Sequence, residues 1–225
     1  MTLRTYPDVE QRSAEWYNLR RGIVTASTVG QLVTPSTLKP ARNDASRGLT
    51  ALLVSERITG WTVDTYQSAE MLRGVLDEPV ARSVYAEHYG AVTECGFMVN
   101  DDTGHAIGYS PDGLVGDDGL IEIKSRAPKA QVALVISGEI PHAHMAQCQA
   151  ALLVSGRAWI DYVAFCGGMA LWVKRIEPDS RWFEAIDDAV QAFEANAAQQ
   201  IEAYRAAVVG LPMTERTFYE MDVVI

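Results

Sequence analysis

The stretch "SPDGLVGDDGLIEIKS", residues 110–125, decides the fold of this chain and raises the question of its function. Asp-Asp-Gly at 117–119 is a strong turn signal between two short apolar runs, which predicts a β-hairpin. Side chains of one parity share a face of a strand, so Glu122 and Lys124 point the same way, while the isoleucines beside them point into the core. Asp112 is expected roughly opposite that end of the strand. Three charged groups can therefore converge on one site.

Charged groups in apolar strands are costly unless they are paired or bound to a metal. Two carboxylates and a lysine suit metal-dependent phosphodiester hydrolysis, because hard oxygen ligands select Mg²⁺ or Mn²⁺. The metal neutralises phosphate charge and lowers the pKa of a bound water, while the lysine orients that nucleophile. The plainer alternative is a solvated strand face that carries a Glu–Lys pair. The spacing Asp-x₉-Glu-x-Lys leaves both interpretations open.

The composition predicts one compact domain that stays in the cytoplasm. The chain has 225 residues, of which 48% are hydrophobic. Its apolar stretches are interrupted well before the roughly 18 residues that a membrane span needs, and its N-terminus has no apolar core of the signal-peptide type. The three cysteines are scattered without ligand spacing for zinc or an iron–sulfur cluster, so we expect buried, reduced thiols.

The net charge of −10 excludes a wholly basic nucleic-acid-binding surface. The distribution is uneven, however: residues 1–60 hold eight Lys and Arg against five Asp and Glu, and the remainder holds eleven against twenty-four. An acidic protein can still bind DNA through a local basic channel, with acidic outer surfaces that limit non-specific adhesion. Net charge alone therefore decides nothing about DNA.

Capping residues and apolar periodicity predict six helices: 14–22, 27–33, 46–60, 67–89, 141–156 and 179–208. Ser13 caps the first, Thr25 or Ser27 caps the second, and the fourth is either continuous or broken near Pro79. The segment 34–46, with two prolines, is predicted to be a loop. Alternation predicts strands besides the hairpin at 92–100, 158–166 and 170–177. This order predicts an α/β or α+β domain with one mixed central sheet wrapped by helices.

Five sequence blocks together resemble one family: "EWYNLRRGIVTAS" (15–27), "RGVLDEPVARSVY" (73–85), "GYSPDGL" (108–114), "GLIEIKS" (119–125) and "HMAQCQAALLVSG" (144–156). Their order is that of phage λ exonuclease and the YqaJ-like viral recombinase family, within the PD-(D/E)xK nuclease superfamily. The resemblance implies a restriction-endonuclease-like fold, in which helices flank a central mixed β-sheet. It also implies a single domain over 1–225, with a helical DNA-end-binding part at 1–60, a catalytic core at 61–176, and a C-terminal helix and tail at 177–225.

The resemblance assigns catalytic roles to four residues: Glu78, Asp112, Glu122 and Lys124. The two carboxylates of the hairpin would bind Mg²⁺, with Mn²⁺ as a substitute, and the backbone carbonyl of Ile123 would be a further ligand. The lysine would position the attacking water. Glu78 would complete the metal site directly or through a water. Its neighbour Asp77 is the rival candidate, which the Glu-x-x-Ala-Arg register disfavours.

For DNA, the resemblance implies that Arg20 grips the 5′-terminal phosphate, with Arg21 as the rival. Guanidinium groups suit this role because they pair with phosphate through two hydrogen bonds. Ser27 and Ser110 match hydroxyls near the same phosphate, although each also suits a cap or a turn.

In the predicted helix 141–156, Gln147 matches a family glutamine that faces the active site. Gln149 lies about 200° further around the helix, so both cannot face one point. His142 and His144 are two residues apart and cannot share a metal as i, i+4 pairs do, so we expect them to have local roles. Trp16 is expected in the core rather than stacked on a base.

The resemblance implies a 5′→3′ exonuclease that acts on linear double-stranded DNA with a 5′-phosphate end and releases 5′-mononucleotides. The remaining 3′ single strand would pass to a single-strand annealing protein in phage recombination, and relatives assemble as rings of three subunits. One alternative is a sequence- or structure-specific endonuclease of the same fold. Another is a non-catalytic module that binds DNA ends, which would need no Mg²⁺ and would release no nucleotide.

Overall fold

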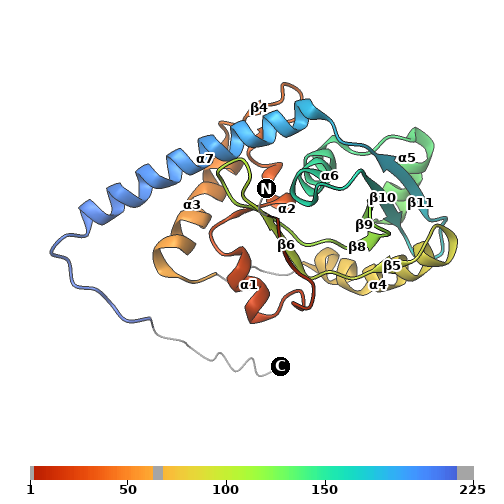
Figure 1. Ribbon diagram of the computed structural model, residues 1–225, viewed down its shortest axis with the longest axis horizontal. Coiled ribbons are helices and arrows are strands. Elements are labelled where there is room, and N and C mark those ends of the chain that lie inside the picture. The colour runs from red at the N-terminus through yellow and green to blue at the C-terminus, as the bar shows by residue number, and fades with distance from the viewer. Residues whose placement is uncertain (1–2, 63–67, 217–225) are drawn as a thin grey trace.

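In a computed structural model, which describes residues 3–62 and 68–216, the predicted hairpin is present within a mixed α/β fold (Figure 1). The hairpin belongs to a five-stranded sheet in the order β11-β10-β9-β8-β5. Its strands are β5 (Val92–Thr93), β8 (Gly113–Val115), β9 (Gly119–Ser125), β10 (Trp159–Phe165) and β11 (Trp172–Ile176). Strands β9 and β10 run parallel and the other pairs run antiparallel. This is the mixed sheet that the sequence predicts.

A second sheet, of four strands in the order β1-β6-β7-β2, was not predicted. Its strands are β1 (Arg4–Tyr6), β2 (Val24–Thr25), β6 (Phe97–Asn100) and β7 (Ile107–Tyr109). The single strand predicted over 92–100 is wrong, because the chain passes from one sheet to the other at Gly96. A Cβ atom there would lie 1.9 Å from the carbonyl oxygen of Val9, so only glycine permits this close approach of two backbones.

The first sixty residues are therefore less helical than predicted. Strands β1 and β2 pair with β6 and β7 of the second sheet. Within the segment predicted to be a loop, β4 (Lys39–Pro40) pairs antiparallel with β3 (Val33–Thr34). This N-terminal part is thus tied by backbone hydrogen bonds to the strand that leads into the hairpin.

The six predicted helices are present, with one addition and two corrections: the helix predicted over 27–33 ends at Val29, and the helix predicted from 46 begins at Asp44, inside the predicted loop, with Asn43 as its cap. The helices of the structure are α1 (Ala14–Arg20), α2 (Ala26–Val29), α3 (Asp44–Thr59), α4 (Ala69–His88), α5 (Pro128–Ser137), α6 (His142–Ser155) and α7 (Ser180–Ala207). Ser13 and Thr25 are the caps of α1 and α2, and α4 continues through Pro79. Helix α5 was missed, although Pro128 at its start and Gly138 in the left-handed conformation after its end are typical helix signals.

Helices cover both faces of the central sheet, as Figure 1 shows for α6 and α4. Leu120 and Tyr162 belong to the larger core, which contains residues of α2, α3, α6 and α7. Ile121 and Ile123 belong to a smaller core against α4. The alternation along β9 therefore has the predicted result: Glu122 lies on the α6 side of the sheet and the isoleucines lie on the α4 side.

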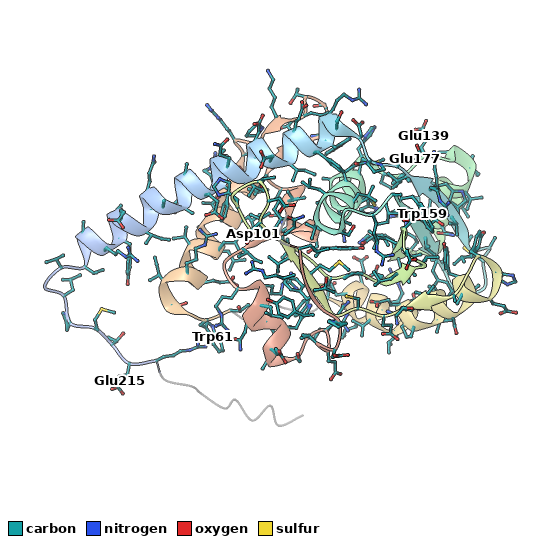
Figure 2. The ribbon with its side chains drawn as sticks, viewed as in Figure 1. Trp61, Asp101, Glu139, Trp159, Glu177 and Glu215 are labelled. Carbon is teal, nitrogen blue, oxygen red and sulfur yellow. The ribbon has the colours of Figure 1, made fainter. Side chains whose placement is uncertain are left out.

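An ion pair secures the outer strands of this sheet. Asp161 of β10 is buried, and both of its carboxylate oxygens accept hydrogen bonds from Arg175 of β11, at 2.8 and 2.9 Å. The Tyr85 hydroxyl of α4 donates a third hydrogen bond to Asp161. The guanidinium of Arg175 also stacks 3.5 Å from the centroid of Trp159, which Figure 2 labels. This buried charge is paired, as burial requires.

The three cysteines are buried and free, as predicted. Among the helices in the described ranges, none is both long and apolar enough to cross a membrane.

Candidate active site

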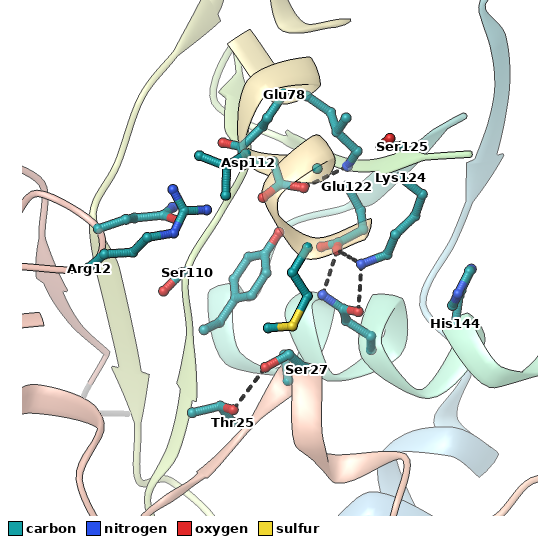
Figure 3. A pocket seen from close by; sticks show the side chains of 18 of the residues that line it. Arg12, Thr25, Ser27, Glu78, Ser110, Asp112, Glu122, Lys124, Ser125 and His144 are labelled. Carbon is teal, nitrogen blue, oxygen red and sulfur yellow. Dashed lines mark hydrogen bonds and ion pairs between the residues drawn. The ribbon is translucent and has the colours of Figure 1, made fainter. Parts of the chain in front are cut away.

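The charged residues of the hairpin converge as the strand pattern predicts (Figure 3). Lys124 Nζ donates a hydrogen bond to Glu122 Oε1 at 2.7 Å. Asp112, which directly precedes β8, accepts a 2.6 Å hydrogen bond at Oδ2 from the backbone N–H of Ile123. The carboxylate across the turn is thus held beside the strand that carries the other two charges.

Helix α6 adds an amide to this group. Gln147 Oε1 accepts a hydrogen bond from Lys124 Nζ at 3.0 Å, and Gln147 Nε2 donates to Glu122 Oε1. Gln149 faces elsewhere: it is buried and its amide binds backbone groups of the connection between β11 and α7. The two glutamines thus lie on different sides of α6, and Gln147 is the one beside Glu122 and Lys124.

Helix α4 contributes Glu78 and an arginine that holds it in place. Arg82 Nη2 donates a 2.5 Å hydrogen bond to Glu78 Oε1, and Arg82 Nε donates a 2.7 Å hydrogen bond to the backbone carbonyl of Asp112. One guanidinium therefore links the helix-borne carboxylate to the segment that carries a hairpin carboxylate. The rival Asp77 accepts a hydrogen bond from Ser125 instead.

Helix α1 places an arginine over an indole ring. The guanidinium carbon of Arg20 lies 3.9 Å from the centroid of Trp16, and Trp16 Nε1 donates a 2.7 Å hydrogen bond to Ser110 Oγ. Trp16 is buried, as predicted. Burial lowers the pKa of Arg20. Arg21, the rival, donates a hydrogen bond to Asn18 on its own helix.

One cavity of about 690 Å³ lies between these elements. The residues that the sequence assigned to the site all line it: Arg20, Ser27, Glu78, Ser110, Asp112, Glu122, Ile123, Lys124 and Gln147. They come from distant parts of the chain, namely α1, α2, α4, α6, β9 and the connection between β7 and β8, and Ser27 reaches the cavity from the start of α2.

The cavity concentrates negative charge. Burial raises the pKa of Asp112 well above its usual value, and the charges of Glu122 and Glu78 raise it further. Burial also raises the pKa of Glu78, against the opposing charge of Arg82. Burial lowers the pKa of Lys124, but the neighbouring carboxylates outweigh burial and the net pKa is raised. The lysine is thus held protonated, and the carboxylates outnumber their cations.

One carboxylate oxygen is suited to a metal. Glu122 Oε2 is buried and has no hydrogen-bond partner among the residues that the structure describes. An unpaired buried oxygen of this kind costs free energy unless an ion or water binds it. Across 3–62 and 68–216, no group of three or more His, Cys, Asp and Glu side chains is arranged to hold a metal by itself. The oxygen atoms available at the hairpin are those of Glu122, Asp112 and the main chain, and oxygen atoms are hard ligands that would fit Mg²⁺.

The residues that line the cavity without having been assigned to it from the sequence include Arg12, Tyr109 and His144. His144 Nδ1 lies 2.8 Å from the hydroxyl of Tyr162, and burial, followed by the charges of Lys124 and Arg126, lowers its pKa to about 4. The sequence predicted only a local role for this histidine. For Tyr109, its place before "SPDG" was the available signal, since β7 leads directly into that segment.

Known proteins resemble this chain in sequence and fold. The family model described as YqaJ-like viral recombinase domain matches residues 15–158. The crystal structure of an alkaline exonuclease from Laribacter hongkongensis is 32% identical, with a TM-score of 0.78, and the match covers 89% of this chain and 100% of that one. The structure of that protein in complex with dAMP matches equally well.

A phage-related exonuclease from Haemophilus somnus 129PT is 14% identical with a TM-score of 0.59, over 83% of this chain and 98% of that one, and shares the fold alone. None of the curated proteins matches the sequence. The fold is restriction-endonuclease-like, as predicted. With a family match over more than half of its length and a 32% identical relative covered throughout, the chain belongs to the YqaJ-like viral recombinase family.

Proposed function

We propose that this protein is a Mg²⁺-dependent exonuclease that degrades one strand of linear double-stranded DNA in the 5′→3′ direction. The family match and the likeness to an alkaline exonuclease support a nuclease. The observation that carries the metal-dependent chemistry is the Oε2 atom of Glu122, which is buried without a partner in the described structure. The other oxygen of the same carboxylate, Oε1, pairs with Lys124. That arrangement supports binding of a divalent cation between the carboxylates of Glu122 and Asp112.

Asp112 and Glu122 would hold Mg²⁺, together with the carbonyl of Ile123, and Glu78 would contribute directly or through a water. Mn²⁺ would substitute, because it accepts the same oxygen ligands. When bound, the ion would neutralise phosphate charge and lower the pKa of a coordinated water.

The lysine and the glutamine would position the nucleophile. Lys124 stays protonated, and Gln147 fixes its ammonium between two oxygen acceptors, so its third N–H can orient the attacking water. Attack at phosphorus would break the bond to the 3′ oxygen of the terminal nucleotide, which leaves as a 3′-hydroxyl. The phosphate would remain on the next nucleotide as a new 5′ end.

Arg20 would receive that 5′-phosphate. Its guanidinium is partly buried and stacked on Trp16, so it is already oriented before DNA binds. Ser110 and Ser27 would add hydroxyl contacts in the same cavity. The relative bound to dAMP supports a mononucleotide as the product that this cavity accepts.

The remaining single strand would pass to an annealing protein in the cytoplasm of the host cell, and a ring of three subunits would retain the DNA. Both proposals rest on the family membership. A ring would also reconcile a net charge of −10 with DNA binding, because basic groups would face an inner channel.

The test is digestion of end-labelled linear duplex DNA with Mg²⁺ or with EDTA, comparing 5′-phosphate and 5′-hydroxyl ends with a closed circle. Mg²⁺-dependent release of mononucleotides from linear DNA alone, faster from the 5′-phosphate, is the expected result. Cutting of the circle would instead establish an endonuclease of the same fold. DNA binding without Mg²⁺ and without product would establish an end-binding module.

A further inference from the structure

Arg12 has an unusual backbone conformation at the edge of the cavity. Its φ angle is 71°, and Leu38 is the other non-glycine residue with positive φ in the described part of the chain. Side chains with a Cβ atom are strained in this left-handed region, which glycine adopts freely. Strain of this kind persists only where the surroundings enforce it, and it is concentrated at functional sites.

The residues around Arg12 hold it against the segment that carries Asp112. On one side, Gln11 Nε2 donates a 3.2 Å hydrogen bond to the carbonyl of Pro111. On the other side, Ser13 caps helix α1 and donates its own N–H to Glu10. The strained residue therefore lies between two anchored neighbours, and its side chain is presented from a fixed position.

The side chain of Arg12 extends into the cavity. Figure 3 shows it on the side of the site that Glu78, Asp112 and Ser110 occupy, across from His144. It is exposed, and among the described residues no hydrogen bond or ion pair involves its guanidinium. Its charge acts on Glu78 without a direct contact.

The other cations of the cavity are already engaged. Lys124 binds Glu122 and Gln147, and Arg20 is stacked on Trp16. The guanidinium of Arg12 has all of its donors available on the side of the metal-binding carboxylates. A guanidinium in that position matches the non-bridging oxygens of a phosphodiester, with which it forms paired hydrogen bonds.

We propose that Arg12 binds a backbone phosphate of the DNA strand that is being degraded, beside the carboxylates of Asp112 and Glu78. This inference rests on the proposed function and adds a second phosphate contact, separate from the Arg20 pocket. The guanidinium would reduce the repulsion between the DNA phosphates and the carboxylates of the cavity at the point where the DNA backbone passes them.

The decisive variant is Arg12→Gly, because glycine removes the guanidinium and also relieves the backbone strain. Its midpoint of thermal unfolding is expected to equal or exceed that of the wild type, whereas DNA binding weakens. Arg12→Lys keeps the charge but loses the paired geometry. Arg205→Ala is the charge control, since Arg205 lies near the far end of α7 and pairs with Glu202.

Binding to a 5′-phosphorylated duplex is measured with Ca²⁺ in place of Mg²⁺ over a series of salt concentrations. Arg12→Gly is expected to weaken binding roughly tenfold to a hundredfold, as the loss of a charged hydrogen bond does. It is also expected to reduce the slope of log K against log[salt] by about 1, the value for one phosphate contact. Arg12→Lys should keep the slope, and Arg205→Ala should keep both the affinity and the slope.

Affinity and salt slope like those of the wild type in Arg12→Gly would overturn the inference while the exonuclease itself remains active. An equal loss in Arg205→Ala would also overturn it, because the effect would then be one of general charge. If the wild-type protein neither bound nor degraded DNA, the proposed function would fail first and this inference with it.

Discussion

Lys124 and Glu122, two residues apart on strand β9, form a 2.7 Å ion pair that uses only one oxygen of the carboxylate. The other oxygen, Oε2, is buried without a partner in the described structure. The lysine and Gln147 thus hold the carboxylate in one orientation, so that its free oxygen is directed to a single place. Rigid placement of this kind is what a metal ligand and a positioned nucleophile require.

Replacing Glu122 with glutamine should abolish the metal function while preserving shape. We expect nuclease activity to fall by roughly three orders of magnitude, since a metal site supplies several kcal/mol to the transition state. The rise in unfolding temperature when Mg²⁺ is added should also disappear. The control for the activity and for the Mg²⁺-induced rise in unfolding temperature is Glu139→Gln, because Glu139 is an exposed carboxylate on the loop between α5 and α6. Full activity in Glu122→Gln would exclude the proposed metal site.

The two glutamines of α6 offer a matched pair. Gln147→Ala should reduce the turnover number with little change in stability, because its amide fixes the Lys124–Glu122 pair at the cavity. Gln149→Ala should cost about 1–3 kcal/mol of unfolding free energy, because it leaves a cavity at a buried position and removes two hydrogen bonds to the main chain. Its activity should be retained below the melting temperature. Denaturant unfolding and turnover measurements on both variants would show the opposite pattern if these assignments were reversed.

Arg82 is expected to position Glu78 and Asp112 rather than to touch DNA. Arg82→Lys removes the guanidinium that binds the Asp112 carbonyl and Glu78 at the same time. We expect the Mg²⁺ concentration for half-maximal activity to rise about tenfold, the effect typical of losing a group that orients a metal ligand, with activity recovered at high Mg²⁺. Glu94, which pairs with Arg82 at 3.0 Å but is 77% exposed, is the control, and Glu94→Gln should change little. A lower melting temperature with unchanged Mg²⁺ dependence would show that Arg82 is only structural.

Stability without metal should decrease as pH rises. Burial and the charges of Glu122 and Glu78 raise the pKa of Asp112, so the folded protein binds this proton more tightly than the unfolded chain does. That stabilisation is complete below the unfolded pKa of about 3.9 and is lost as pH rises through the folded pKa. We expect the melting temperature in EDTA to fall over this range. In Asp112→Asn, the melting temperature should change less with pH. If it fell with pH as steeply as in the wild type, the raised pKa of Asp112 would be contradicted.

The hairpin and its site were largely predictable from local patterns. The turn at 117–119 and the period of two along β9 determine that Glu122 and Lys124 share a face. The period of 3.6 along α6 separates Gln147 from Gln149. These are consequences of backbone geometry, which holds wherever the segment lies in the fold. The order of helices and strands was also predictable, apart from α5 and the short strands.

The division into two sheets was not predictable, because it depends on the close approach of Gly96 to Val9, two segments far apart in the chain. The same limit applies to Arg82 and Arg12, whose charges look ordinary in the sequence. Their functions depend on which backbone carbonyl or cavity lies within reach, and long-range packing decides that.

By itself, the sequence determined the chemistry available to this protein: the carboxylates, the lysine and the strand that aligns them. Local periodicity and turn preferences suffice for that result. Only the tertiary structure decided how α1, α4 and α6 enclose the strand, which guanidinium is free, and which carboxylate oxygen is left unpaired. Those properties depend on burial and on distances between elements that no local pattern contains.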